Sequence, residues 1–222
     1  MRTDDMGTDG RTRLIGAAIE SFAASGFGVP VRAIADRAGV TAGLIRHHFG
    51  SKDALREVCD AEVLARYRSL KRDAMAQSPL PMFGAVSKNP GNAVLIVYVV
   101  RAAREGGETA RRFLERFIAE ALAISREATH DGLLVSSRDE QARARYLITM
   151  TLGALSIQLA LKPEIALADF PRVLDEVMAE TTLPALEIFT EGVFADRRYL
   201  DAYLEYLHSD SAPDGRDQGV GS

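Results

Sequence analysis

Apolar residues recur three and four positions apart along most of this chain, which is the spacing of helices that bury one face. In the first such stretch Leu14, Ala18 and Phe22 fall on one side, and Gly26 follows where the helix should end. The pattern near the N-terminus predicts helices from near Asp9 to Gly26, from Pro30 to Gly39, from Thr41 to Phe49, and from Lys52 to about Gln77.

Helical spacing continues through the rest of the chain. It predicts helices over about residues 94–105, 109–129, 138–161, 169–190, where Pro184 should cause a kink, and 196–208. The run Val94–Val100 resembles a strand in composition, but it continues into a polar helical stretch and has no second run to pair with. We therefore predict an all-α fold in which this helix, apolar on all sides, occupies the middle of a bundle.

Composition and charge narrow the class of protein. Cys59 is the only cysteine, so an intramolecular disulfide is excluded. The longest apolar stretch, Leu147–Leu161, is shorter than the ~20 residues that span a bilayer, and no signal peptide begins the chain. These features predict a cytoplasmic protein. Residues 1–52 hold seven Lys or Arg against five Asp or Glu, whereas the remainder holds twenty against twenty-six, as expected if only the N-terminal part meets phosphate.

The segment Ile34–Phe49 carries the strongest functional signal. Its pattern predicts two short helices that cross around a tight turn, with Gly39 supplying the turn and Val40 filling the crossing. Ile45 and Phe49, four positions apart, should anchor the second of these helices on the core. This arrangement is typical of a helix-turn-helix unit, whose second helix lies in the major groove of DNA.

These residues resemble the TetR family of bacterial transcription regulators. The likeness runs from about Arg11 to Leu55. The matching segments are Gly26-Phe27, Ile34-Ala35, Ala38-Gly39-Val40, His48-Phe49 and Ser51-Lys52-Asp53-Ala54-Leu55. The resemblance implies a three-helix DNA-binding domain over residues 9–51, preceded by a flexible arm (1–8). It also implies a larger helical domain for ligand sensing and dimerisation (52–208), and a disordered tail (209–222) completes the predicted organisation.

Two positions depart from the family pattern. Pro30 stands where a Thr or Ser is common and removes a hydroxyl that would cap the second helix and touch phosphate. Arg46 stands where Tyr is usual, and its guanidinium can bond guanine or phosphate. We therefore expect this chain to recognise an operator that differs from those of Tyr-bearing relatives.

The candidate DNA-binding residues lie on the two helices of the motif and at the start of the next one: Arg32, Thr41, Ala42, Gly43, Leu44, Arg46, His47 and Lys52. Family position suggests Arg32, His47 and Lys52, whereas Arg46 is chosen because it points away from Ile45 and Phe49. The backbone at the start of the third helix can approach phosphate. Thr41 also suits a plain helix cap, and Leu44 suits the core as well as a thymine methyl.

The resemblance also implies a small apolar effector bound in the C-terminal domain and a homodimer, and by family habit a repressor that the effector releases from a near-palindromic operator. Candidate pocket residues are Tyr98, Arg101, Phe113, Phe117, Met150 and Gln158, although any one of them suits ordinary bundle core better. A dimer face could be formed by Ala154, Leu155, Leu159, Val173, Val177 and Leu186.

Other classes of function find less support. An enzyme using His47, His48 or His130 as a base lacks a nucleophile–base–orienter set and a Gly-rich phosphate loop. Adjacent helix positions point ~100° apart, so His47 and His48 do not readily share a metal ion, and we expect neither metal nor cofactor. The remaining alternative is a DNA-binding regulator that a protein partner controls, or that has no small-molecule effector.

Overall fold

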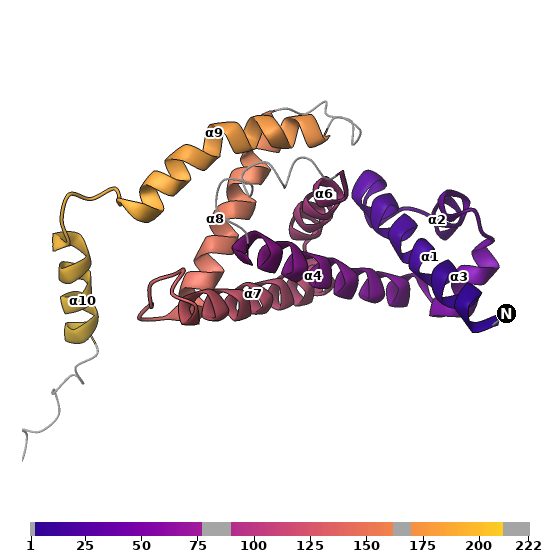
Figure 1. Ribbon diagram of the computed structural model, residues 1–222, viewed down its shortest axis with the longest axis horizontal. Helices are drawn as coiled ribbons and strands as arrows, with labels where there is room; N and C mark the ends of the chain where they lie inside the picture. Colours follow the sequence, from indigo (N-terminus) through magenta and orange to yellow (C-terminus); the bar gives the residue numbers. More distant parts are fainter. Residues whose placement is uncertain (1–2, 77–89, 162–169, 211–222) are drawn as a thin grey trace, which may run out of the picture. The chain divides into compact units, whose positions relative to one another are not determined.

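The computed structural model describes residues 3–76, 90–161 and 170–210, and all regular structure within them is helical (Figure 1). The predicted fold class is confirmed. In chain order the helices are α1 (Thr3–Ser25), α2 (Val31–Ala38), α3 (Ala42–Phe49), α4 (Lys52–Ala76), α6 (Pro90–Glu105), α7 (Gly107–His130), α8 (Glu140–Leu161), α9 (Phe170–Thr190) and α10 (Arg198–Asp210).

Helix α6 forms the centre of the packing, as its apolar sequence predicted. Six of its residues between positions 93 and 100 are buried, and it packs against α1, α4, α7 and α8. Aromatic rings form a continuous row through this core. Phe27 contacts Phe22 and Tyr98, with ring centroids 5.3 and 5.1 Å apart, and Tyr98 contacts Phe113 at 5.9 Å. The row continues from Phe113 to Phe117 and ends at Tyr67, joining four helices.

The ends of two helices differ from the prediction. Helix α1 begins at Thr3 rather than near Asp9, so positions 3–8 are helical and not an irregular arm. Extending a helix that is already anchored by buried residues costs far less than starting one, and no proline interrupts this stretch. Helix α10 extends through Asp210, two residues into the predicted tail, and residues 211–222 lie outside the described ones.

The chain separates into two compact units, residues 1–177 and 178–222, and each is considered by itself. Within the first unit, α1 packs against both α4 and α6. The proposed division of labour between residues 9–51 and 52–208 remains a prediction. No described helix is long and apolar enough to cross a membrane.

The predicted dimer face is partly wrong. Val173 and Val177 are 2% and 4% exposed within the first unit, so they belong to the core of the protomer. Ala154 and Leu186 are exposed, Leu155 is half-buried, and the side chain of Leu159 lies outside the described part of the chain. Pro184 lies inside α9, which continues to Thr190.

Candidate DNA-binding interface

A buried clamp holds α2 and α3 together. Ile34 and Ala35 on α2 and Ile45 and Phe49 on α3 are all buried, and they lie on the faces that the sequence pattern assigned to the core. Gly39 adopts a left-handed conformation (φ 67°, ψ 32°), and its N–H bonds back to the last turn of α2. The turn therefore needs the glycine that occupies it, since a side chain is disfavoured there.

Side-chain caps fix where the neighbouring helices begin. The Thr41 hydroxyl accepts a hydrogen bond from the Leu44 N–H at 3.3 Å and so caps α3, as predicted. The Ser51 hydroxyl accepts from the Ala54 N–H at 3.0 Å and caps α4. Helix α2 begins after Pro30 without a side-chain cap, in keeping with the predicted loss of a hydroxyl. The two caps therefore fix the residue at which α3 begins and the residue at which α4 begins after it.

The opposite face of the clamp points to solvent. Arg32, Thr41, Ala42, Gly43, Arg46 and His47 are exposed, and Leu44 and Lys52 are half-buried. Helix α3 contains no acidic residue, and Arg46, His47 and His48 lie in its last turn. The outward surface of α3 is therefore basic, whereas its inner surface is apolar.

The cations on this face differ from their neighbours in having no internal partner. Arg37 pairs with Glu20 across 3.5 Å, and the Arg11 guanidinium lies over the Phe49 ring at 5.3 Å. By contrast, Arg32, Arg46 and Lys52 form no ion pair with any residue that the structure describes. Their charges are available to an external anion. His47 and His48 contact each other edge to face, at 5.4 Å between ring centroids.

A buried polar network joins α4 to α6, and the sequence pattern did not predict it. The Tyr98 hydroxyl donates a 2.6 Å hydrogen bond to Asp60, and both residues are buried. Arg56, one turn before Asp60 on α4, is 2.6 Å from Glu105 at the end of α6 and lies over the Phe27 ring at 3.5 Å. Burial raises the pKa of the Asp60 carboxyl above its ordinary value, although the Tyr98 hydrogen bond and Arg56 oppose this.

The predicted effector residues occupy different environments among the described helices. Tyr98, Phe113 and Phe117 are 0–4% exposed and fill the aromatic row, which corresponds to the core alternative. Arg101 donates hydrogen bonds to the carbonyl oxygens of Ala23 and Ala24, so it caps the C-terminal end of α1 instead of facing a ligand. Met150 and Gln158 are half-buried on α8.

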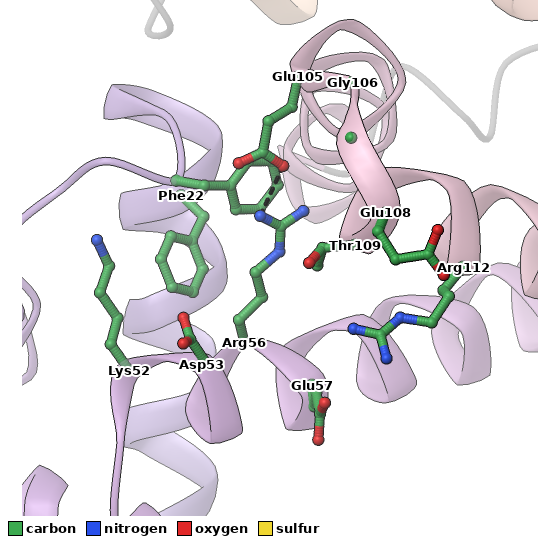
Figure 2. A pocket seen from close by; sticks show the side chains of 12 residues that line it. Phe22, Lys52, Asp53, Arg56, Glu57, Glu105, Gly106, Glu108, Thr109 and Arg112 are labelled. Atoms are coloured by element: carbon green, nitrogen blue, oxygen red, sulfur yellow. Dashed lines mark ion pairs between the residues drawn. The ribbon is translucent and has the colours of Figure 1, made fainter.

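The structure does contain a pocket of about 370 Å³, but in a different place. It is formed by the end of α1 with the turn after it, the start of α4 and the junction of α6 with α7 (Figure 2). Of all the predicted site residues, Lys52 alone contributes to its wall. Within the described residues, no group of three or more His, Cys, Asp or Glu side chains is placed to hold a metal ion.

Two family descriptions match the chain. Residues 14–59 match the bacterial regulatory proteins of the tetR family, and residues 92–195 match the tetracyclin repressor-like C-terminal domain. The first range contains the clamp, the caps and the exposed basic face of α3. The second contains most of α6 and all of α7, α8 and α9.

The chain is also similar to individual proteins. It is 37% identical over 205 residues to the HTH-type transcriptional regulatory protein RaaS of Mycobacterium tuberculosis, covering 92% of this chain and 95% of that protein. Its fold is similar to that of a TetR-family transcriptional regulator from a Rhodococcus species, with a TM-score of 0.57, 20% identity and coverage of 79% and 98% of the two chains. FadR of Bacillus subtilis, solved in complex with stearoyl-CoA, gives a TM-score of 0.55 at 17% identity, covering 83% and 100%.

Proposed function

Because the chain belongs to the tetR family and is therefore a DNA-binding transcriptional regulator, we propose that its α3 face reads a near-palindromic operator. The exposed face of α3 supports this most directly, since its cations lack internal partners while the residues beneath them are clamped in the core. In this proposal Arg46 contacts a base edge or a phosphate in the major groove, and Arg32, His47 and Lys52 contact the flanking backbone.

The half-buried and small residues of α3 complete the proposed contacts. Thr41, Ala42 and Gly43 form the N-terminal end of the helix, where exposed N–H groups and the helix dipole favour phosphate. Gly43 and Ala42 carry little or no side chain, so the backbone can come close to DNA there. Leu44 is half-buried and borders the exposed face, which leaves part of its side chain for a thymine methyl.

We propose further that the regulator acts as a homodimer. In residues 178–210, large apolar side chains are exposed along the second half of α9, in the segment after it and along α10, including Leu183 at 73%, Phe194 at 67% and Tyr203 at 58%. A stretch of exposed apolar groups of this size marks an interaction surface. Two copies joined there would present two α3 helices to successive major grooves about 34–36 Å apart.

We propose, finally, that a small molecule controls DNA binding and that repression is relieved when it binds. Such control requires the ligand to bind one form of the protein more tightly than the other. A thermal-shift screen should find a compound that raises the melting temperature and also weakens operator binding. A compound that stabilises the protein without changing operator affinity would not be an effector.

Selection of bound DNA from a random-sequence pool tests the DNA-binding proposal. We expect two inverted half-sites whose centres are about 10–10.5 base pairs apart, or a multiple of that spacing. Enrichment of a single asymmetric site would contradict binding by a symmetric dimer. Failure to enrich any sequence would contradict sequence-specific recognition by this chain.

A further inference from the structure

Most residues that line the pocket at the start of α4 are charged or polar (Figure 2). The lining residues are Phe22 and Phe27, then Lys52, Asp53, Arg56 and Glu57 of α4, and Glu105, Gly106, Gly107, Glu108, Thr109 and Arg112 at the α6–α7 junction. Its volume of about 370 Å³ is at the lower end of the range of small-molecule sites. Residues far apart in the chain thus enclose a site that suits a compact, polar ligand.

Arg56 is the most unusual residue of this wall. Its side chain is only 9% exposed, and its Nη1 atom is 2.6 Å from Glu105. The Nε and Nη2 atoms, which form the edge that most often grips a carboxylate, are buried and have no hydrogen-bond acceptor among the described residues. Asp60 lies 4.0 Å from Nε, which is too far for a hydrogen bond. Buried charged donors normally have acceptors. The Nε/Nη2 edge of Arg56 is an exception, because it has no acceptor among the described residues.

The first turn of α7 lines the pocket beside Arg56. Gly106, at the N-cap position, has φ 71° and ψ −173°, a conformation essentially restricted to glycine, and it provides no side-chain cap. The N–H groups of this turn therefore carry the partial positive charge of an uncapped helix end. Figure 2 shows the Arg56 guanidinium standing between Glu105 and Thr109, so both sources of hydrogen-bond donors lie on the same side of the pocket.

The acidic residues of the wall limit which anion fits. Glu105 is paired with Arg56, and Glu108 accepts two hydrogen bonds from Arg111, of 2.8 and 2.6 Å. Asp53 and Glu57 form no ion pair with any described residue, and Lys52 and Arg112 line the same pocket. This balance favours a ligand with a single negative charge over a phosphate with two.

We propose that this pocket binds a small molecule through a carboxylate group. The carboxylate bonds the free Nε/Nη2 edge of Arg56 and the first turn of α7, and the rest of the ligand lies towards Lys52 and Arg112. Binding itself is independent of the proposed function, but a role for the site in controlling DNA binding rests on it. That role would follow from position, since the pocket contains Lys52 and the first turns of the helix that directly follows α3.

Titration calorimetry on the full chain tests the proposal with benzoate as the probe. Benzamide serves as its neutral isostere, benzylamine as a cation and inorganic phosphate as a second anion. We expect saturable benzoate binding that raises the melting temperature by about 3–5 °C at ten times Kd. Benzamide and benzylamine should bind at least about tenfold more weakly, because benzamide offers one neutral acceptor oxygen instead of two charged ones and the benzylammonium ion offers none. Phosphate should bind more weakly than benzoate.

Two variants with opposite expected effects separate ligand binding from fold. Arg56→Lys keeps the positive charge beside Glu105 but loses the forked edge, so benzoate should bind about tenfold more weakly. Glu105→Gln removes a competing carboxylate, so benzoate should bind several-fold more tightly, which a purely structural role does not predict. Arg145→Gln, an exposed arginine of α8 outside the pocket, is the matched control and should leave Kd unchanged.

The proposal is overturned if benzoate does not bind saturably, if benzamide or benzylamine binds as well as benzoate, or if Arg56→Lys and Glu105→Gln both leave Kd within twofold. Operator affinity is measured in parallel, so that the two proposals fail separately. If benzoate binds as expected but the chain enriches no DNA sequence, the proposed function fails and the carboxylate site stands. If the operator is bound but benzoate is not, the reverse holds.

Discussion

Arginines on α3 and α4, only ten positions apart, are held in opposite ways. Arg46 is exposed and forms no ion pair with any described residue, whereas Arg56 is buried between an aromatic ring and Glu105. The first arrangement leaves a charge available to DNA and contributes little to folding. The second commits a charge to the interior, where changing any partner affects stability. The difference teaches that an arginine of this chain can serve the fold or face solvent, and that Arg46 is a candidate for DNA contact because it combines the outward side of α3 with the lack of an ion pair.

The largest effect should come from the aromatic row in the core. Phe113 is 1% exposed and contacts both Tyr98 and Phe117. Phe113→Ala should lower the free energy of unfolding by about 3–5 kcal/mol, since it leaves a cavity in the core. Operator affinity, measured below the melting transition, should stay within about twofold of wild type. A variant that kept its stability but lost DNA binding would break the comparison between core and face.

A smaller loss is expected from the buried hydrogen bond between α4 and α6. Tyr98→Phe leaves the Asp60 carboxyl buried without its donor and should cost about 1–3 kcal/mol in chemical denaturation. Because the folded pKa of Asp60 is raised, the folded state retains a proton that the unfolded state releases, and stability falls as pH rises through this window.

Removing the Tyr98 hydroxyl raises that pKa further, since its hydrogen bond lowers it in the wild type. The stability gap between Tyr98→Phe and wild type should therefore widen as pH rises through the folded-state pKa of Asp60 in the wild type, and level off once Asp60 is ionised in both folded proteins. Asp60→Asn, in which Tyr98 keeps an acceptor, provides the matched control and should show no such widening. A gap independent of pH would contradict the assignment to Asp60.

Thr41, the residue that caps α3, should affect both the stability of the fold and the affinity for the operator. Thr41→Ala removes the acceptor of the Leu44 N–H and should destabilise the protein by about 1 kcal/mol, with a matching decrease in operator affinity. Thr41→Ser retains the hydroxyl and should behave like wild type in thermal unfolding. If Thr41→Ala left both stability and DNA binding unchanged, the cap would have no role in positioning α3.

Sequence reasoning succeeded where structure is set by neighbours along the chain. Gly39, Thr41 and Ser51 act on residues at most four positions away, so the turn and the caps could be predicted from local spacing. It failed where partners are distant. Tyr98 and Asp60 are 38 positions apart, and Arg101 lies more than 70 positions from the α1 carbonyls that it bonds. A helical pattern assigns charged residues to solvent and contains no signal for such pairs.

The pocket illustrates the same limit. Its wall combines the end of α1, the start of α4 and the α6–α7 junction, and only Lys52 had been singled out from the sequence. The sequence predicts a helix end at about residue 105, but the uncapped first turn of α7 depends on the backbone angles of Gly106, which composition does not reveal. One sequence feature points towards the pocket. Arg56 and Asp60 each come directly after an apolar residue of α4, Leu55 and Cys59, and so lie at the edge of its buried face.

The central claim is that the unpartnered cations on and beside α3 bind operator DNA. The most direct test measures operator affinity as a function of salt concentration. It compares wild type with Arg46→Ala, Lys52→Ala and the control Arg145→Ala. We predict that Lys52→Ala lowers the salt slope by about 1, and that Arg46→Ala weakens binding by about 1–3 kcal/mol and relaxes base preference if it contacts guanine. Melting temperatures should be unchanged for all the variants. Wild-type affinity and salt slope in both Arg46→Ala and Lys52→Ala would contradict the account.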